Sequence, residues 1–334
     1  MACEGISLRI IASFILGVVA TLTLMVFHQT SNFDGDKSLE KLSFSNETVS
    51  TVSGFVSAVE EGCRRPRDII MTSVNWACAK PDSLLDIFLQ SFWTGEKIDH
   101  FLNHLLIVAF DPQAFERCKL VHHYCYQLKV DVDFTAPQEF LSKGYIELVW
   151  GKIELQRYIL EEGYNVLFTD VDILWFRNPF KIITVYADMA TSCDKYWGDP
   201  DAIYNWANTG FYYVKSSNKT IQMMRYWLDA RNRFPPHHEQ NIFNQIKPDL
   251  VDALGLNIQF VDQKYFGSFC EFSSDLNKIC TMHANCCVNG LDAKIHDMRN
   301  LMEYWKNYTA LPKEEKNKGW FTWTKPGHCK IPDN

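Results

Sequence analysis

Short apolar segments that alternate with amphipathic segments are the feature of this sequence that most restricts its fold. The clearest apolar segments are 68–75, 105–110 and 165–169, and each ends in polar or acidic residues. Amphipathic segments at 83–93 and 148–160 lie between them, with apolar residues at helical spacing. Strands that alternate with helices predict parallel β-α-β units, and therefore an α/β fold with a mostly parallel sheet.

The second half of the chain shows the same pattern less regularly. We expect a strand at 210–214 and helices at 220–232 and 238–246, separated by Pro235 and Pro236. The C-terminal fifth is rich in Cys, Gly and Trp, which predicts loops held by disulfides.

The N-terminal residues predict a membrane anchor. Residues 10–27 are 18 consecutive uncharged, mostly apolar positions, the lower end of what spans a bilayer. The run lacks a good small-x-small cleavage site, which favours an uncleaved anchor over a cleaved signal peptide and leaves both open. We therefore expect a cytoplasmic tail at 1–9, a transmembrane signal anchor at 10–27, a Ser/Thr/Glu-rich stem at 28–62 and a luminal domain at 63–334.

Sequons and cysteines agree with a luminal location for the rest of the chain. Acceptor sequons begin at Asn46, Asn218 and Asn307, all after the expected anchor. Ten of the eleven cysteines also follow the anchor, and Cys3 precedes it. Since no paired C-x-x-C spacing of a zinc site occurs, we predict several disulfides, whose connectivity the sequence leaves open. The chain is thus expected to be a single-pass type II membrane protein.

Net charge excludes one class of partner. A formal charge of −7 at pH 7 leaves no broad basic surface for nucleic acid. The aromatic content of 14% fits either a large core or a carbohydrate-facing cleft, and composition does not separate the two.

An Asp-Val-Asp segment after the most apolar strand carries the chemistry. Asp170 and Asp172 are two residues apart, so in an extended segment both carboxylates face one side and can hold one cation. Carboxylate oxygens suit Mg²⁺ or Mn²⁺, and such an ion neutralises a departing diphosphate. Because parallel strands present their carboxyl ends at one edge, Ser73 and Asp111 should converge with these acids. The alternative is a pair of solvated acids in a turn, since D-x-D is a frequent pattern.

The segment from Phe168 to Pro179, FTDVDILWFRNP, resembles the D-x-D segment of plant Golgi nucleotide-diphospho-sugar transferases, grouped as glycosyltransferase family 77. Other matching segments follow the family order: Trp150-Gly151-Lys152, Asn208-Thr209-Gly210-Phe211, Glu239-Gln240-Asn241-Ile242-Phe243-Asn244, and His283-Ala284-Asn285 with Gly290 and Lys294. The resemblance covers about residues 68–300. It implies a GT-A fold, a UDP-sugar donor, a divalent metal and a place in the Golgi membrane.

The resemblance also implies roles for single residues. Asp170 and Asp172 would hold the metal together with His283, for which a structural histidine is the alternative. Residues at strand ends or in matching motifs are implied to bind the donor: Thr72, Ser73, Asn75, Asp111, Lys152, Asn208, Thr209, Gly210 and Lys294. Lys294 would place an ammonium near the leaving diphosphate, and Gly210 would let the backbone approach the donor sugar closely.

Glu239 and Gln240 are the catalytic candidates. Members of the family are retaining, and a double displacement would need a carboxylate near the anomeric carbon. Glu239 is the candidate nucleophile, whereas Gln240 can only donate or accept hydrogen bonds. A front-face route without an enzymic nucleophile is equally open, and so is a purely structural Glu239 in the first turn of a helix.

Two other functions compete with the transferase. The aspartyl phosphatases of the haloacid dehalogenase class also place an Asp after an apolar strand, but their pattern requires Thr or Val where this chain has Leu174. A non-catalytic sugar-binding or scaffold protein would keep the fold without turnover. We expect a Golgi glycosyltransferase that uses Mn²⁺ or Mg²⁺ and moves a sugar, with a pentose as one candidate, to a cell-wall polysaccharide or glycoprotein. The donor sugar, the linkage and any association with itself or other transferases stay open.

Overall fold

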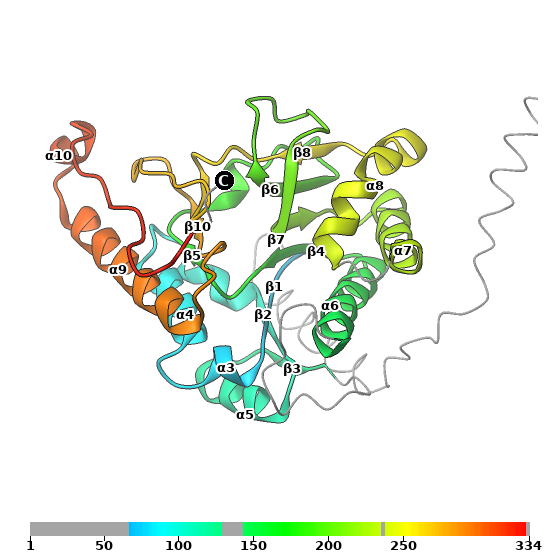
Figure 1. Cartoon of the computed structure of the whole chain (residues 1–334), viewed down its shortest axis with the longest axis horizontal. Helices are drawn as coiled ribbons and strands as arrows, with labels where there is room; N and C mark the ends of the chain where they lie inside the picture. The colour runs from blue at the N-terminus through cyan, green and yellow to red at the C-terminus, as the bar shows by residue number, and fades with distance from the viewer. Residues whose placement is uncertain (1–66, 129–142, 235–237, 332–334) are drawn as a thin grey trace, which may run out of the picture. The chain divides into compact units, whose positions relative to one another are not determined.

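The computed structural model describes residues 67–128, 143–234 and 238–331 (Figure 1). The expected tail, anchor and stem at 1–62 lie outside these ranges, as do Asn46, Cys3 and Cys63. Within the described residues, no helix is both long enough and apolar enough to cross a membrane. The anchor therefore stays a prediction.

A central sheet organises the described part of the chain. Its strands are β1 (Asp68–Val74), β2 (Leu105–Ala109), β3 (Cys125–Gln127), β4 (Asn165–Thr169), β6 (Met189–Lys195), β7 (Trp206–Val214) and β8 (Ile258–Phe260). Their order across the sheet is β3-β2-β1-β4-β7-β6-β8. Strand β7 runs antiparallel to both β4 and β6, whereas β1, β2, β3 and β4 pair in parallel, as do β6 and β8. The predicted α/β fold with a mostly parallel sheet is confirmed, and the reversed strand β7 was not predicted.

Helices cover both faces of this sheet. Their bounds are α3 (Trp76–Ala79), α4 (Leu84–Thr94), α5 (Pro112–Val121), α6 (Lys143–Glu161), α7 (Asn218–Arg233), α8 (Glu239–Leu254), α9 (Leu291–Ala310) and α10 (Lys313–Asn317). Figure 1 shows α6, α7 and α8 together on one face and α4 and α9 on the other. For α4 and α6 the reason is the strand order: the chain moves outward from β1 to β3 and then returns to β4, so right-handed crossovers place these two helices on opposite faces.

A smaller sheet carries part of the site. It consists of β5 (Ile173–Trp175), β10 (Thr281–His283) and β9 (Phe266–Ser268), in the order β5-β10-β9. Strand β5 follows the Asp-Val-Asp segment directly and packs against α4, where the Trp175 ring stacks on Phe92 with centroids 4.8 Å apart. Burial of this aromatic pair fixes the turn that carries Asp170 and Asp172.

Much of the aromatic content lies in the core. Four tryptophans are among the largest fully buried side chains: Trp150, Trp175, Trp227 and Trp305. A large core therefore accounts for many of the aromatic residues, and others are exposed on the surface.

The C-terminal part differs from its prediction. Helix α9 is 20 residues long and buries Met298, Leu301, Met302 and Trp305 at helical spacing, so the expectation of loops is wrong there. The surrounding Cys, Gly and Trp residues hid this apolar stripe. The expected disulfides are present: Cys118–Cys125, Cys270–Cys286 and Cys287–Cys329. Helix α8 also continues past its predicted end at residue 246, through Pro248.

Candidate active site

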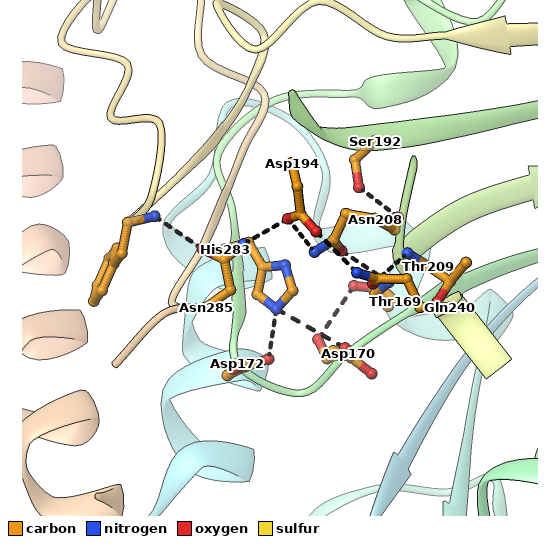
Figure 2. Close-up of polar contacts among 12 residues, drawn as sticks. Thr169, Asp170, Asp172, Ser192, Asp194, Asn208, Thr209, Gln240, His283 and Asn285 are labelled. Carbon is orange, nitrogen blue, oxygen red and sulfur yellow. Dashed lines mark hydrogen bonds and ion pairs between the residues drawn. The ribbon is translucent and has the colours of Figure 1, made fainter. Parts of the chain in front are cut away.

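The Asp-Val-Asp segment and His283 meet at the carboxyl end of β4. His283 ends β10 and pairs with Ile173 of β5, which brings its ring over the two acids (Figure 2). Its Nε2 lies 3.8 Å from Asp170 Oδ2 and 3.3 Å from Asp172 Oδ1. One ligand atom from each residue lies within 4.8 Å of the others, so the triad can hold a metal ion.

Gly210 allows this close arrangement. It lies on β7 beside β4, where the Asp170 N–H donates to its carbonyl at 2.7 Å. A β-carbon at this position would lie 2.5 Å from His283 Cε1 and 2.6 Å from Asp170 Oδ2. Any side chain would therefore push the triad apart, and the glycine predicted at the donor site allows these three side chains to approach one another.

The pKa values of the two acids of the triad are shifted in opposite directions. Burial would raise the pKa of Asp172, but the Lys294 ammonium at 2.6 Å and the His283 ring hold that pKa well below its usual range. Burial, with a contribution from Asp172, raises the pKa of Asp170 to about 6, although the Lys152 ammonium opposes the rise. The site thus holds one firmly ionised carboxylate beside one whose charge a bound cation would stabilise.

Asp194 lies in the site and was not predicted from the sequence. It lies at the end of β6, where its carboxylate accepts from Asn208 Nδ2 at 2.8 Å, Gln240 Nε2 at 2.8 Å and Asn285 Nδ2 at 3.3 Å (Figure 2). The Thr209 N–H in turn donates to Gln240 Oε1 at 3.0 Å. Burial raises the pKa of Asp194. The network joins β6, β7, α8 and the segment after β10. It brings together three of the predicted site residues, Asn208, Thr209 and Gln240.

Glu239 and Lys152 form a buried ion pair. Lys152 Nζ lies 3.1 Å from Glu239 Oε1, and the two side chains are 8% and 7% exposed. Burial would raise the pKa of Glu239, but Lys152 lowers it to about 2. Among the described residues, Glu239 Oε2 makes no hydrogen bond and lies 3.4 Å from the ring of His238. The ammonium expected near phosphate is therefore held by this carboxylate, and its contact with the donor stays a prediction.

The residues predicted at the ends of β1 and β2 have structural contacts. Asp111 caps α5, accepting from Ala114 N at 2.8 Å and from Trp76 N at 2.7 Å. Asn75 caps α3, accepting from Cys78 N at 3.1 Å. Thr72 is fully buried and Ser73 is partly exposed. Their donor-binding roles stay predictions.

Helix α3 nevertheless lies near the site. Burial raises the pKa of the Cys78 thiol to about 12, with further contributions from Asp172, Asp170 and Asp111. The contributions of Asp170 and Asp172 agree with the convergence of strand ends that a parallel sheet predicts.

A second group of possible metal ligands lies on α9 and the C-terminal segment. It consists of His296, Asp297 and His328, also with ligand atoms within 4.8 Å of one another. The buried Asp297 carboxylate already accepts from the backbone N–H groups of His328 and Cys329, at 3.1 and 2.7 Å. This group attaches the C-terminal segment to α9, and the first triad is the candidate metal site at the predicted Asp-Val-Asp segment.

The two described sequons are accessible at their asparagines. Asn218 begins α7 and Asn307 lies on α9, and both are exposed. Thr220 of the first sequon is fully buried in the capping box of α7. Glycosylation at both positions stays a prediction.

The fold and the site define a class of protein, and comparison with known proteins identifies the family. A mixed α/β fold with two acids after a central strand, a histidine and a lysine is that of a glycosyltransferase of the nucleotide-diphospho-sugar type. Residues 100–298 match the family model of nucleotide-diphospho-sugar transferases. The chain is also 38% identical over 272 residues to the uncharacterized protein At4g15970 of Arabidopsis thaliana, covering 80% of this chain and 71% of that protein. The chain therefore belongs to the nucleotide-diphospho-sugar transferase family.

Two further likenesses are more partial. The Arabidopsis thaliana beta-arabinofuranosyltransferase RAY1 is 39% identical over 163 residues, 47% of this chain and 27% of that protein. Among solved structures, a glycosyltransferase involved in glycosylation of the major capsid of PBCV-1 is 13% identical with a TM-score of 0.42, covering 70% of this chain and all of that one. The assignment to the family depends on the sequence matches.

Proposed function

We propose that this protein is a metal-dependent transferase that moves a sugar from a UDP-sugar to a glycan or glycoprotein, with retention of anomeric configuration. The observation that carries the proposal is the convergence of Asp170, Asp172 and His283 beside Lys294 at one sheet edge. Two carboxylates with one imidazole suit Mn²⁺ better than Mg²⁺, which prefers oxygen ligands. When bound there, the ion would neutralise charge on the leaving diphosphate.

The chain's own residues have separate tasks around that ion. Lys294 brings a second positive charge to the leaving group, since its ammonium already lies against Asp172. Asp194 holds the amides of Asn208 and Gln240, and the second N–H group of each amide can donate to the donor sugar and orient it.

Glu239 is a poor nucleophile in this arrangement. Its carboxylate is paired with Lys152 and has a pKa of about 2, which reduces its nucleophilicity. Gln240 has no nucleophilic oxygen that could displace the diphosphate. We therefore favour the front-face route over double displacement. Azide added to the Glu239→Ala variant distinguishes the two routes, because a sugar azide of inverted configuration forms only when a catalytic carboxylate has been removed.

The donor sugar and the location are further parts of the proposal. The likeness to a protein described as a beta-arabinofuranosyltransferase makes a pentose our first candidate. The apolar segment at 10–27 and the sequons after it support a Golgi membrane protein of type II topology. The described disulfides agree with an oxidising lumen.

Release of UDP tests the proposal most directly. The full-length chain in detergent is incubated with a panel of UDP- and GDP-sugars, with Mn²⁺ or with a chelator. We expect release from one UDP-sugar that depends on the metal. If no sugar nucleotide is hydrolysed, and calorimetry detects no binding of any of them, the transferase proposal is wrong and a scaffold role takes its place.

A further inference from the structure

The segment from Asp194 to Asn208 leaves the candidate site and returns to it. Lys195, which ends β6, pairs with Trp206, which begins β7. The Asn208 amide donates to the Asp194 carboxylate at 2.8 Å and closes the base of the loop. Residues 196–205 are therefore an excursion whose two ends are both anchored in the site (Figure 2).

This loop and the first residue of β7 expose three large aromatic side chains. Trp197 is 56% exposed, Tyr204 is 61% exposed and Trp206 is 45% exposed. The rings of Trp197 and Tyr204 are in edge contact, with centroids 5.9 Å apart. Other exposed tryptophans of the described residues, such as Trp93 and Trp320, are far from these in sequence. Three large exposed aromatic side chains thus lie within ten residues, two of them in contact, and clustered exposed apolar side chains mark binding sites.

Buried polar contacts hold the loop in one conformation. Asn205 is fully buried, and its amide oxygen accepts from the Trp197 N–H at 2.9 Å while its amide nitrogen donates to the Asp199 carbonyl at 2.6 Å. Lys247 donates to the Asn205 carbonyl from α8. The aromatic rings are thus presented on a pre-organised backbone, which lowers the entropy lost when a ligand binds.

Strand β7 connects the exposed aromatic residues to the triad of Asp170, Asp172 and His283. Trp206, Asn208 and Gly210 follow one another along β7, whose pairing with β6 shifts register twice in this part of the strand. Gly210 contacts the triad, Asn208 lies next along the strand, and Trp206 lies at the exposed end.

We propose that Trp197, Tyr204 and Trp206 bind the acceptor, and that the acceptor is a neutral oligosaccharide. This inference rests on the proposed transferase function. Aromatic rings bind sugars by stacking on the apolar C–H faces of the rings, and the indole N–H and phenol O–H supply hydrogen bonds to hydroxyls. The exposed Asp199 and Asp201 on the same loop would repel an acidic glycan. Three aromatic rings can stack on several linked sugars. A polypeptide acceptor that offers a single hydroxyl group would not need such a surface.

Calorimetry of the full-length chain with neutral oligosaccharides, without donor, tests the inference independently of turnover. We expect Trp197→Ala, Tyr204→Ala and Trp206→Ala each to weaken oligosaccharide binding by about 3- to 10-fold, the loss of one stacked ring. The Trp206→Phe variant should restore most of the affinity. Trp93→Ala, which removes an equally exposed ring at the end of α4, is the matched control and should bind as the wild type does.

The outcomes separate this inference from the proposed function. If oligosaccharide binding depends on Trp206 while no sugar nucleotide is hydrolysed or bound, the acceptor surface stands and the transferase proposal fails. If UDP release and transfer occur but the three alanine variants keep wild-type acceptor affinity and KM, the acceptor inference is wrong. Preference for acidic oligosaccharides or for peptides over neutral oligosaccharides would also overturn it.

Discussion

A single methyl group added at Gly210 should displace the side chains that form the metal triad. The new β-carbon would lie 2.5 Å from His283 Cε1, 2.6 Å from Asp170 Oδ2 and 2.9 Å from Asn208 Oδ1. Carbon atoms in contact normally lie about 3.5–4.0 Å apart. The histidine ring must therefore move by about 1 Å, and the Asp170 carboxylate by somewhat less.

The size of the effect follows from these distances. Inserting a methyl group into a packed site costs about 1–3 kcal/mol of stability. Moving reacting or ligating groups by about 1 Å lowers activity by about 100-fold. We therefore expect Gly210→Ala to lose far more activity than its modest loss of stability explains, together with weaker Mn²⁺ binding.

Metal-dependent UDP release and Mn²⁺ calorimetry measure the two losses, and thermal unfolding measures stability. Gly327→Ala is the matched control, because a β-carbon there meets nothing within 4 Å and that glycine has no positive φ. Gly210→Ala with wild-type metal affinity and turnover would refute the close approach of β7 to the triad.

Three further substitutions test separate parts of the site. Asp172→Ala should abolish metal-dependent UDP release while circular dichroism shows a folded protein; wild-type turnover would remove the metal assignment. Lys152→Met removes the ammonium partner of the buried Glu239 carboxylate and should destabilise the fold by about 3–5 kcal/mol in denaturant unfolding, whereas an unchanged midpoint would contradict burial of the pair. The pKa of Glu239 is about 2 in the folded state, below its ordinary value. The ion pair should therefore stabilise the wild type fully above about pH 5 and lose that effect as the pH falls toward 2. Acid unfolding of the wild type and of the Lys152→Met variant measures this dependence. Asp194→Asn turns an amide N–H toward another amide and should lower kcat about 10- to 100-fold with little change in Mn²⁺ affinity; equal losses of both would show that the network supports the metal instead.

The sequence predicted the parts of the fold whose signals are local. The strands at 68–74 and 165–169 and helix α4 have unbroken apolar patterns, and their positions are confirmed. The site residues that follow β4 were found because polar residues stop an apolar strand abruptly. These signals need no knowledge of distant residues.

The parts that were missed depend on tertiary contacts. Strand β6, with the sequence MATSCDK, has too few branched apolar residues to stand out, and so Asp194 at its end was not recognised. The reversed direction of β7 comes from its pairing with β4 and β6, which no pattern within residues 206–214 encodes. The importance of Gly210 also depends on His283, which lies 73 positions later in the chain.

The position of Lys294 depends on bonds that form far from the Asp-Val-Asp segment. Lys294 lies in the first turn of α9. The C-terminal segment contacts this helix through Asp297, and the disulfide Cys287–Cys329 joins that segment to the residues just before α9. A second disulfide, Cys270–Cys286, ends three residues after His283. Two of the groups that meet Asp172 are thus fixed by cross-links that persist only in an oxidising compartment. Reduction of these bonds should free α9 and the end of β10, and weaken donor and metal binding together. Because disulfides persist in oxidising compartments, we propose a luminal location for the domain.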